Sequence, residues 1–257
     1  MSIETFFLIG TVVFCASCLQ SATGLGYGVI AGPIFLFIFN SDEALQLSAL
    51  HNLAIAVILT PLIYKDVDRK FLKNLIIGGL LGTLIGFIIQ ILVSINFLKI
   101  FATLVIFFVA VSLFQNTPKK KYKNFKKFPT FLEIKIVGII SGIMGGILAI
   151  PGPIAAAWMS FKGFSKKEIR ASVIIFFVFV YGTIVGLYIV VRGIPANILY
   201  LSLELSPFVA IGLIIGTFLS KIISEKSFHY ILLGILILIF LSLLSNLLKH
   251  NFKYLIQ

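Results

Sequence analysis

The chain consists largely of apolar runs about as long as a lipid bilayer is thick. A helix needs about 20 mainly apolar residues to cross the hydrocarbon core. We expect apolar elements at Ile3–Ala22, Leu25–Phe39, Ala44–Tyr64, Phe71–Val93, Phe97–Phe114, Phe131–Leu148, Ile154–Phe161, Ile169–Val191, Ile198–Leu219 and Phe228–Leu248. Only 12% of the residues are charged, against about 25% in soluble domains. The sequence therefore predicts an all-α, polytopic membrane protein with about 8–10 membrane helical elements.

The basic residues lie mainly in short loops between the apolar runs. The net charge is +12, but there is no basic stripe with interleaved aromatic residues on a soluble domain, so nucleic-acid binding is disfavoured. Lysine and arginine in short loops are typical of the cytoplasmic side. The basic segment 116–130 is predicted to be a cytoplasmic linker between membrane repeats at 1–115 and 131–257 in the cell (inner or plasma) membrane. A lipid-binding or regulatory tail is the alternative for this segment.

The two halves of the chain share several features in the same order. GLGYGVIAGP (Gly24–Pro33) parallels GIMGGILAIPGP (Gly142–Pro153), and LQLSAL (Leu45–Leu50) parallels IRASVI (Ile169–Ile174). LIIGGLLGTLIG (Leu75–Gly86) parallels VAIGLIIGTFLS (Val209–Ser220). Recurrence of this kind indicates an internal duplication.

The topology depends on what the chain does at the two glycine-rich breaks. If it turns back there, each half has five elements and the second half is inverted. The loops near Lys65–Lys73, Lys119–Lys127, Lys162–Arg170 and Lys221–Lys226 then share the cytoplasmic side. If each break is only a kink, the repeats are parallel and two of these loops face outward. The positive-inside rule favours the inverted repeats.

The breaks themselves are candidates for a binding site. Irregular backbone at membrane depth survives only in protein or beside a watery cavity, and broken elements at matching positions of two repeats point to a transporter's site. A helix that starts after each break offers free amides and a partial positive charge to an anion. The alternative is close helix packing by small residues, which we favour for Gly78, Gly82 and Gly86.

Polar residues near the breaks complete the candidate site. Hydroxyl and amide groups there could bind an anion or could satisfy the backbone of the broken helix, and both interpretations stay open. The candidate binding residues are Gln20, Ser21, Thr23, Gly24, Gly26, Gly28, Gly32, Pro33, His51, Asn52, Ser141, Gly145, Gly146, Gly152 and Pro153.

Three ionisable residues near the apolar elements have open roles. His51 could bind the anion, relay a proton or form a structural hydrogen bond, and its repeat counterpart is Ile175. Glu204 could couple proton movement to transport or could reach the interface. Arg170 could attract or bind an anion, although a role as a cytoplasmic anchor is favoured. Cys15 and Cys18 lack further ligands for a zinc site, so we expect no metal and no cofactor.

The two breaks, each followed by a polar turn and a helix containing alanine or serine, resemble those of the TauE/SafE sulfite exporter family. The resemblance covers nearly the whole chain. It implies a permease for small sulfur-containing anions such as sulfite, sulfoacetate and other organosulfonates. In two places the sequence departs from the family pattern: Tyr27 interrupts the glycines of the first break, and Ile150-Pro151 is an addition in the second.

The expected function is therefore secondary transport of a small anion by alternating access. The partners would be the anionic substrate, the lipid bilayer and a coupling proton or cation. A channel-like facilitator is one alternative, and a transporter of another small anion, such as a carboxylate, is a second. An intramembrane enzyme is disfavoured, because no paired nucleophile and base are recognisable.

Overall fold

A computed structural model describes residues 2–115 and 129–222, together with eight residues between 233 and 245. The elements in these ranges are helical. They are α1 (Ile3–Thr23), α2 (Tyr27–Phe39), α3 (Glu43–Ile63), the short 3₁₀ helix η1 (Tyr64–Asp66), α4 (Arg69–Leu92), α5 (Ile95–Gln115), α6 (Phe131–Leu148), α7 (Gly152–Phe161), α8 (Lys166–Val191) and α9 (Ala196–Ile222).

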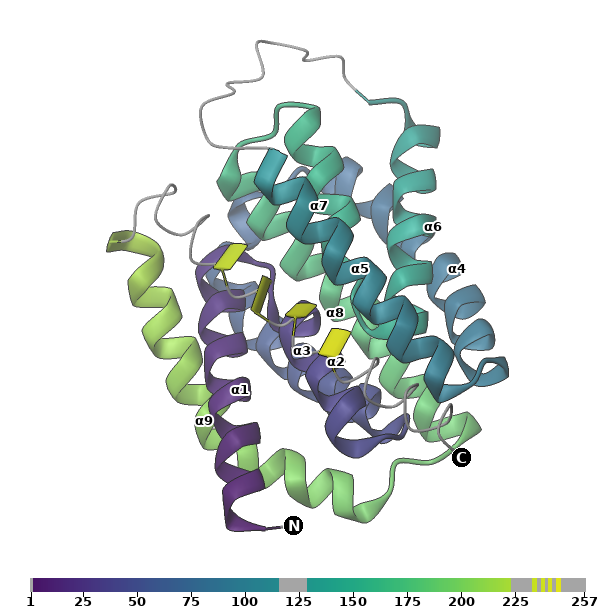
Figure 1. The fold of residues 1–257 in the computed structure, drawn as a ribbon. Helices are drawn as coiled ribbons and strands as arrows, with labels where there is room; N and C mark the ends of the chain where they lie inside the picture. The colour runs from purple at the N-terminus through teal and green to yellow at the C-terminus, as the bar shows by residue number, and fades with distance from the viewer. Residues whose placement is uncertain are drawn as a thin grey trace.

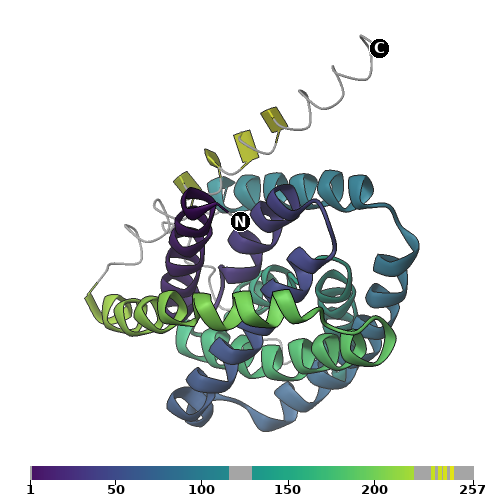
Figure 2. The same ribbon diagram turned by 90° about the horizontal axis from the view of Figure 1, so that it is seen from below.

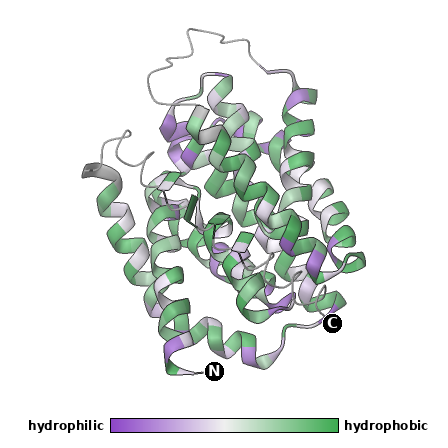
Figure 3. Cartoon of the chain, in the orientation of Figure 1, coloured by the Kyte–Doolittle hydropathy of each residue, from purple (hydrophilic) through white to green (hydrophobic). Residues whose placement is uncertain are grey.

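The helices confirm the predicted class of a polytopic membrane protein. Six of the described helices are long and apolar enough to cross a bilayer, namely α1, α3 with η1, α4, α6, α8 and α9. Many large apolar residues are exposed along these helices. Hydrophilic residues gather towards the two ends of the bundle (Figure 3). The element expected at Phe228–Leu248 lies mostly outside the described residues.

Two ion pairs identify which loops share an end of the bundle. Lys162, after α7, pairs with Glu133 at the start of α6, with 3.1 Å between Nζ and Oε2. Arg192, after α8, pairs with Asp42, just before α3. We call these the Lys162 end and the Arg192 end. Because α3 begins at the Arg192 end and α8 begins at the Lys162 end, these two corresponding helices are antiparallel (Figure 1).

The remaining helices follow the same inversion. Contacts along α1 and α9 show that these helices run parallel, as do α4 and α6. Since α9 starts just after Arg192, α1 rises from the Arg192 end and α2 returns to it. In the same way, α6 descends from the Lys162 end and α7 returns to Lys162. The chain therefore turns back at both breaks, as the inverted interpretation predicts.

Glycines hold the two parallel pairs in close contact. A Cβ on Gly78 or Gly82 of α4 would collide with the carbonyl of Lys135 or Ile139 on α6. The matching Gly212 and Gly216 of α9 meet the carbonyls of α1 in the same way, at Phe14 and Cys18. This confirms the packing role favoured for the α4 glycines. Each repeat thus packs its first helix against the fourth helix of the other repeat.

The view along the bundle shows how these pairs are arranged. The first part of α9 crosses the Arg192 end of the bundle, and its later part runs beside α1 (Figure 2). Farther along, α9 changes direction (Figure 1), and its first half contains Pro207. Proline in a helix interior removes one backbone hydrogen bond and favours a bend. The bend lets α9 contact both α3 and α1.

Side-chain caps start the helices of the second repeat at the Lys162 end. Thr130 and Glu133 form a capping box at the start of α6, and Ser165 and Glu168 form another at the start of α8. Each box satisfies backbone amides that have no partner within the helix. In contrast, α2 and α7 have no side-chain cap at their first turns. Their first amides are therefore available to other partners.

Candidate functional site

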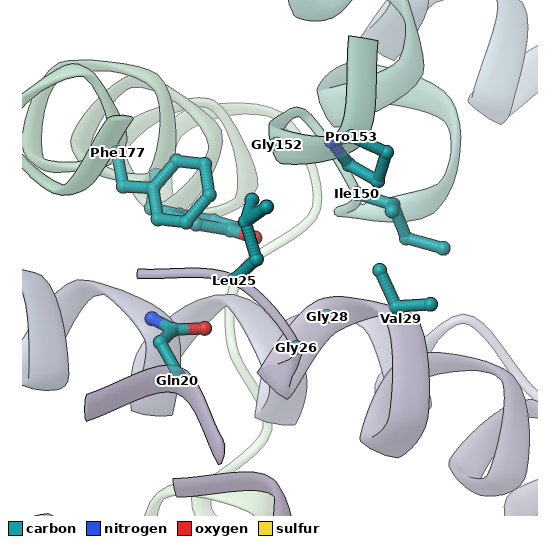
Figure 4. Close-up of a pocket in the computed structure, with 10 residues that line it drawn as sticks. Gln20, Leu25, Gly26, Gly28, Val29, Ile150, Gly152, Pro153 and Phe177 are labelled. Atoms are coloured by element: carbon teal, nitrogen blue, oxygen red, sulfur yellow. The ribbon is translucent and has the colours of Figure 1, made fainter. Parts of the chain in front are cut away.

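The two breaks meet inside the bundle around one small cavity (Figure 4). Its volume for water-sized spheres is about 10 Å³, which is room for about one water molecule. Residues of both breaks and of α8 line it: Gln20, Leu25, Gly26, Gly28, Val29, Ile150, Gly152, Pro153, Phe177 and Tyr181. The cavity therefore combines five of the residues predicted from the sequence with five that were missed.

Left-handed backbone produces both reversals of the chain. At the first break, Gly24 has φ of 84° and Gly26 has φ of 134°. Glycine adopts these values without the steric cost that a Cβ would impose. At the second break the same role falls to Ala149, with φ of 57°, which is uncommon for a residue that carries a Cβ. The second reversal is consequently held by its surroundings rather than by glycine.

The second reversal is fixed by a hydrogen bond from α8. The hydroxyl of Tyr181 donates to the carbonyl of Ala149 over 2.9 Å. A Cβ on Gly28 would collide with that carbonyl and lie 3.0 Å from the Tyr181 hydroxyl. Gly28 therefore allows α2 to rest directly on the second break.

A reciprocal contact joins α7 to the first break. A Cβ on Gly152 would collide with Cδ2 of Leu25 and lie 2.7 Å from Cζ of Phe177. Leu25 lies between Gln20 and Phe177 in Figure 4 and is half-buried. Each helix that follows a break thus touches the other break through a glycine, and the Leu25 side chain fills the space between them.

Gln20 brings a polar side chain to the cavity. Its Oε1 accepts a hydrogen bond from the Tyr27 amide over 3.1 Å, which secures the first residue of α2. Its Nε2 is buried and has no hydrogen-bond partner among the described residues. In the register of the α1 and α6 glycine contacts, Gln20 corresponds to Ser141. The Ser141 hydroxyl is also buried without a partner in the described ranges, but Ser141 does not line the cavity.

Two other predicted polar residues bond to nearby backbone. The Ser21 hydroxyl donates to the Cys18 carbonyl over 3.1 Å, with the Gly212 carbonyl at 3.4 Å. The Thr23 hydroxyl lies 2.8 Å from the Leu19 carbonyl and accepts from the Leu25 amide over 3.1 Å. These contacts match the alternative in which the side chains satisfy the broken helix.

Five further predicted residues lie outside the cavity lining. Gly24 packs against Arg170, and Gly32 faces the Leu148 carbonyl and the Ser48 hydroxyl at ordinary van der Waals distances. Gly146 packs on α4, where a Cβ would lie 2.5 Å from the Thr83 carbonyl oxygen. The last two, Gly145 and Pro33, are also buried.

His51 and Asn52 lie on α3, next to the cavity but not in its lining. His51 Nδ1 is 2.6 Å from the Tyr27 hydroxyl, and Nε2 is 3.1 Å from the Ser202 carbonyl of α9. Because a carbonyl only accepts, Nε2 carries a hydrogen. When the ring is neutral, Nδ1 therefore accepts from Tyr27. Asn52 donates to the Ser48 carbonyl over 2.8 Å. Glu204, the other proposed coupling residue, has an exposed side chain on α9 and is not brought to the breaks.

Arg170 reaches the first break from the first turns of α8. Its Nη2 donates to the Ser21 carbonyl over 2.6 Å, which satisfies one of the last carbonyls of α1. Its Nε is buried and has no partner among the described residues. The bond to Ser21 gives the side chain a structural role at the end of α1. The side chain also packs against Gly24 of the first break.

The five missed residues gave different signals in the sequence. Leu25 stands inside the quoted glycine motif, and Tyr181 is a tyrosine with a polar group inside an apolar run. The others, Val29, Ile150 and Phe177, are apolar residues in apolar segments. Only the fold reveals that these apolar side chains line the same cavity as Gln20.

Comparison with known proteins agrees with this arrangement. A model of the family described as Sulfite exporter TauE/SafE matches residues 9–243. A search of curated proteins and a search of solved structures each returned no match. The family match includes both breaks, all described helices from most of α1 to α9 and the glycines that join them. The chain therefore belongs to the TauE/SafE sulfite exporter family of membrane proteins.

Proposed function

We propose that the protein is a secondary transporter that carries small sulfur-containing anions, such as sulfite, sulfoacetate or other organosulfonates, by alternating access. The observation that supports the proposal is that the first turns of α2 and α7, one from each inverted repeat, meet at a cavity lined mostly by buried residues. Gln20 adds a buried amide nitrogen without a partner in the described residues. Transporters with inverted repeats commonly bind substrates at such paired broken elements.

The proposed site would hold the anion by hydrogen bonds rather than by a direct ion pair. The amides of Gly28 and Val29 belong to the first turn of α2, and that of Gly152 belongs to the first turn of α7. These amides have no acceptor within their own helices. Together with Gln20 Nε2, they supply donors for sulfonate or sulfite oxygens, and the two helix starts add partial positive charge. Arg170 would attract the anion towards the break.

The size of the cavity supports a moving transporter over a static filter. About 10 Å³ holds about one water molecule, so an anion with several heavy atoms must separate the two breaks before it binds. Leu25 and Phe177, which meet at Gly152, are the side chains that must move. Opening towards one end at a time would give alternating access.

Counterflow in proteoliposomes tests the proposal. Wild-type protein should exchange labelled sulfite or sulfoacetate against an internal pool with saturation. Gly152→Leu should insert but lose exchange, because the new side chain would overlap with Leu25 and Phe177. The matched control is Gly186→Leu on α8, where a Cβ has no neighbour within 4 Å. Normal exchange by Gly152→Leu would refute the site, and non-saturable flux would support the channel-like facilitator.

Ligand-dependent thermal stability of the purified protein tests the substrate class. Sulfite, thiosulfate, taurine and sulfoacetate would be compared with carboxylates of similar size. A ligand that binds only the folded protein raises its apparent stability. Larger shifts with the sulfur oxyanions would support the proposal, whereas larger shifts with carboxylates would support the carboxylate alternative.

Cysteine labelling tests the proposed orientation in the cell membrane. The Lys162 end carries the basic loops, so we assign that end and linker 116–130 to the cytoplasm. Lys166→Cys and Ser94→Cys, each in a background without Cys15 and Cys18, mark the two ends. An impermeant reagent added outside intact cells should label the Ser94→Cys variant only. Labelling of the Lys166→Cys variant from outside would reverse the assignment.

A further inference from the structure

A second cavity lies at the Arg192 end, away from the breaks and the basic loops. Its volume for water-sized spheres is about 170 Å³, against about 10 Å³ at the breaks. Three connections of the chain contribute to it: Ser41 and Asp42 before α3, Gln90 and Val93 around the end of α4, and Arg192 after α8. The volume is far more than one water molecule needs, so a small organic molecule could enter.

Gln90 gives this cavity an unusual polar wall. The side chain is only 2% exposed, and neither Oε1 nor Nε2 has a hydrogen-bond partner among the described residues. An unsatisfied buried polar group costs about 1–3 kcal/mol, and such groups in native proteins call for an explanation. Gln90 lines the cavity, but its amide atoms are covered, so a polar molecule would bond to the amide after the side chain turns towards the cavity.

The charged groups of the cavity come from both repeats. Arg192 of the second repeat pairs with Oδ2 of Asp42 of the first. Arginine has five N–H donors, and one of them is used in this pair. Asp42 makes no side-chain cap bond to α3, although it occupies the N-cap position. The cavity lining thus contains one cation, one carboxylate and one amide that has no hydrogen-bond partner among the described residues.

We propose that this cavity binds a small zwitterion that carries an acidic group and an ammonium group a few bonds apart. Arg192 binds the acidic group, and Asp42 binds the ammonium group. Gln90 either donates from Nε2 to the acidic group or accepts at Oε1 from the ammonium group. A simple anion fits less well, because it would compete with Asp42 for Arg192 and leave the Asp42 carboxylate without a cationic partner in the cavity lining. The site shares no residue with the cavity at the breaks, so the proposal stands independently of the transported anion.

Calorimetric titration of the purified full-length protein tests the choice of ligand. β-Alanine is the zwitterion, and propionate and propylamine each keep one of its charged groups. We expect saturable binding of β-alanine and at least about tenfold weaker binding of the other two, because each leaves one charged partner unmatched. Taurine, titrated in parallel, shows whether a sulfonate replaces the carboxylate. Absence of saturable β-alanine binding, or equal affinity for propionate, would overturn the proposal.

Variants locate the bound molecule. Gln90→Leu should weaken β-alanine binding about tenfold, and it should keep the fold because it removes an unsatisfied amide. Arg192→Gln should weaken it at least as much, while the partly exposed ion pair contributes little to stability. The control is Gln20→Leu at the breaks, which should leave β-alanine affinity unchanged while it lowers anion counterflow. Unchanged affinity in Gln90→Leu, or lost affinity in Gln20→Leu, would contradict the assignment.

Discussion

The first and second breaks occupy matching places in two inverted repeats, but they are built differently. The first reverses through Gly24 and Gly26, whereas the second reverses through Ala149, which the Tyr181 hydroxyl holds. In the register of the glycine contacts, α6 continues about one turn past the point where α1 ends. α7 is correspondingly short, with 10 residues against 13 in α2. The symmetry therefore lies in the direction of the helices and not in the details of the loops.

The chemistry of the two breaks differs as well. The first repeat contributes the Gln20 amide and the Tyr27–His51 hydrogen bond. At the positions of Gln20 and His51, the second repeat has Ser141, which does not line the cavity, and Ile175. Both repeats supply a helix start and apolar side chains to the cavity, but their polar groups differ: the first supplies the Gln20 amide, and the second supplies the Tyr181 hydroxyl.

The largest expected effect concerns the reciprocal glycine contacts. Gly28→Ala should abolish anion counterflow, because its Cβ would collide with the Ala149 carbonyl. Relieving this clash would require a shift of the backbone of α2 or of the second break. Gly32→Ala on the same helix should keep most activity, since its nearest neighbours are at 3.5 and 3.6 Å. Counterflow and membrane yield would be measured for both variants. Equal activity of the two would show that contact between the breaks is unimportant.

A second experiment compares the matching polar residues. Gln20→Leu should lower counterflow about 10- to 100-fold, the value expected for loss of a hydrogen bond to a charged ligand. Ser141→Ala should change it less than about threefold, because Ser141 lies outside the cavity lining. Rates for both would be measured at saturating and subsaturating anion. Similar losses in both variants would mean that the two repeats contribute equal polar contacts.

The smallest expected effect concerns the hydrogen bond that only the first repeat has. Tyr27→Phe removes the bond to His51, and His51→Leu removes that bond together with the bond to the Ser202 carbonyl. Each variant should lower counterflow about 5- to 10-fold, because it leaves buried partners unsatisfied. The double variant should be little worse than either single variant, since the two side chains share that bond. Additive losses would instead indicate separate roles for Tyr27 and His51.

Proton coupling through His51 gives the same experiment a further readout. Protonation turns Nδ1 from an acceptor into a donor, so the Tyr27 hydroxyl would have to reverse the direction of its hydrogen bond. Tyr27 is the first residue of α2, and a change in this bond would act directly on the first break. If His51 carries the coupling proton, His51→Leu should lose the dependence of counterflow on a pH gradient. A full gradient response in that variant would exclude this role.

Much of the fold was predictable because apolar length and glycine spacing are local signals. The helices from α1 to α9 begin and end within three residues of the expected apolar elements. The inverted arrangement followed from the distribution of lysine and arginine. The packing role of Gly78 and Gly82 followed from their four-residue spacing. These signals survive in a single sequence, since they depend on neighbours along the chain.

The cavity was only partly predictable, because its lining depends on contacts across the repeats. Gly28 and Gly152 were recognised from the motifs, but the residues that they touch, Ala149 and Leu25, were not. Ser21 and Thr23 looked like anion ligands, yet backbone carbonyls engage their hydroxyls. A hydroxyl near a helix end can bind an anion or can form a hydrogen bond with the nearby backbone. Such a residue can be assigned only when its partner is known.

The exchange of partners between repeats also bears on how the protein is made. Helix α1 emerges from the ribosome well before its glycine-bearing partner α9 is synthesised. Until then the face of α1 around Phe14 and Cys18 lacks its native neighbour, and the carbonyls there that approach Gly212 and Gly216 must face lipid or other helices. The N-terminal half therefore cannot complete its packing during translation. Assembly of the mature bundle must wait for α9, so truncation before α9 would leave even the first helix without its docking site.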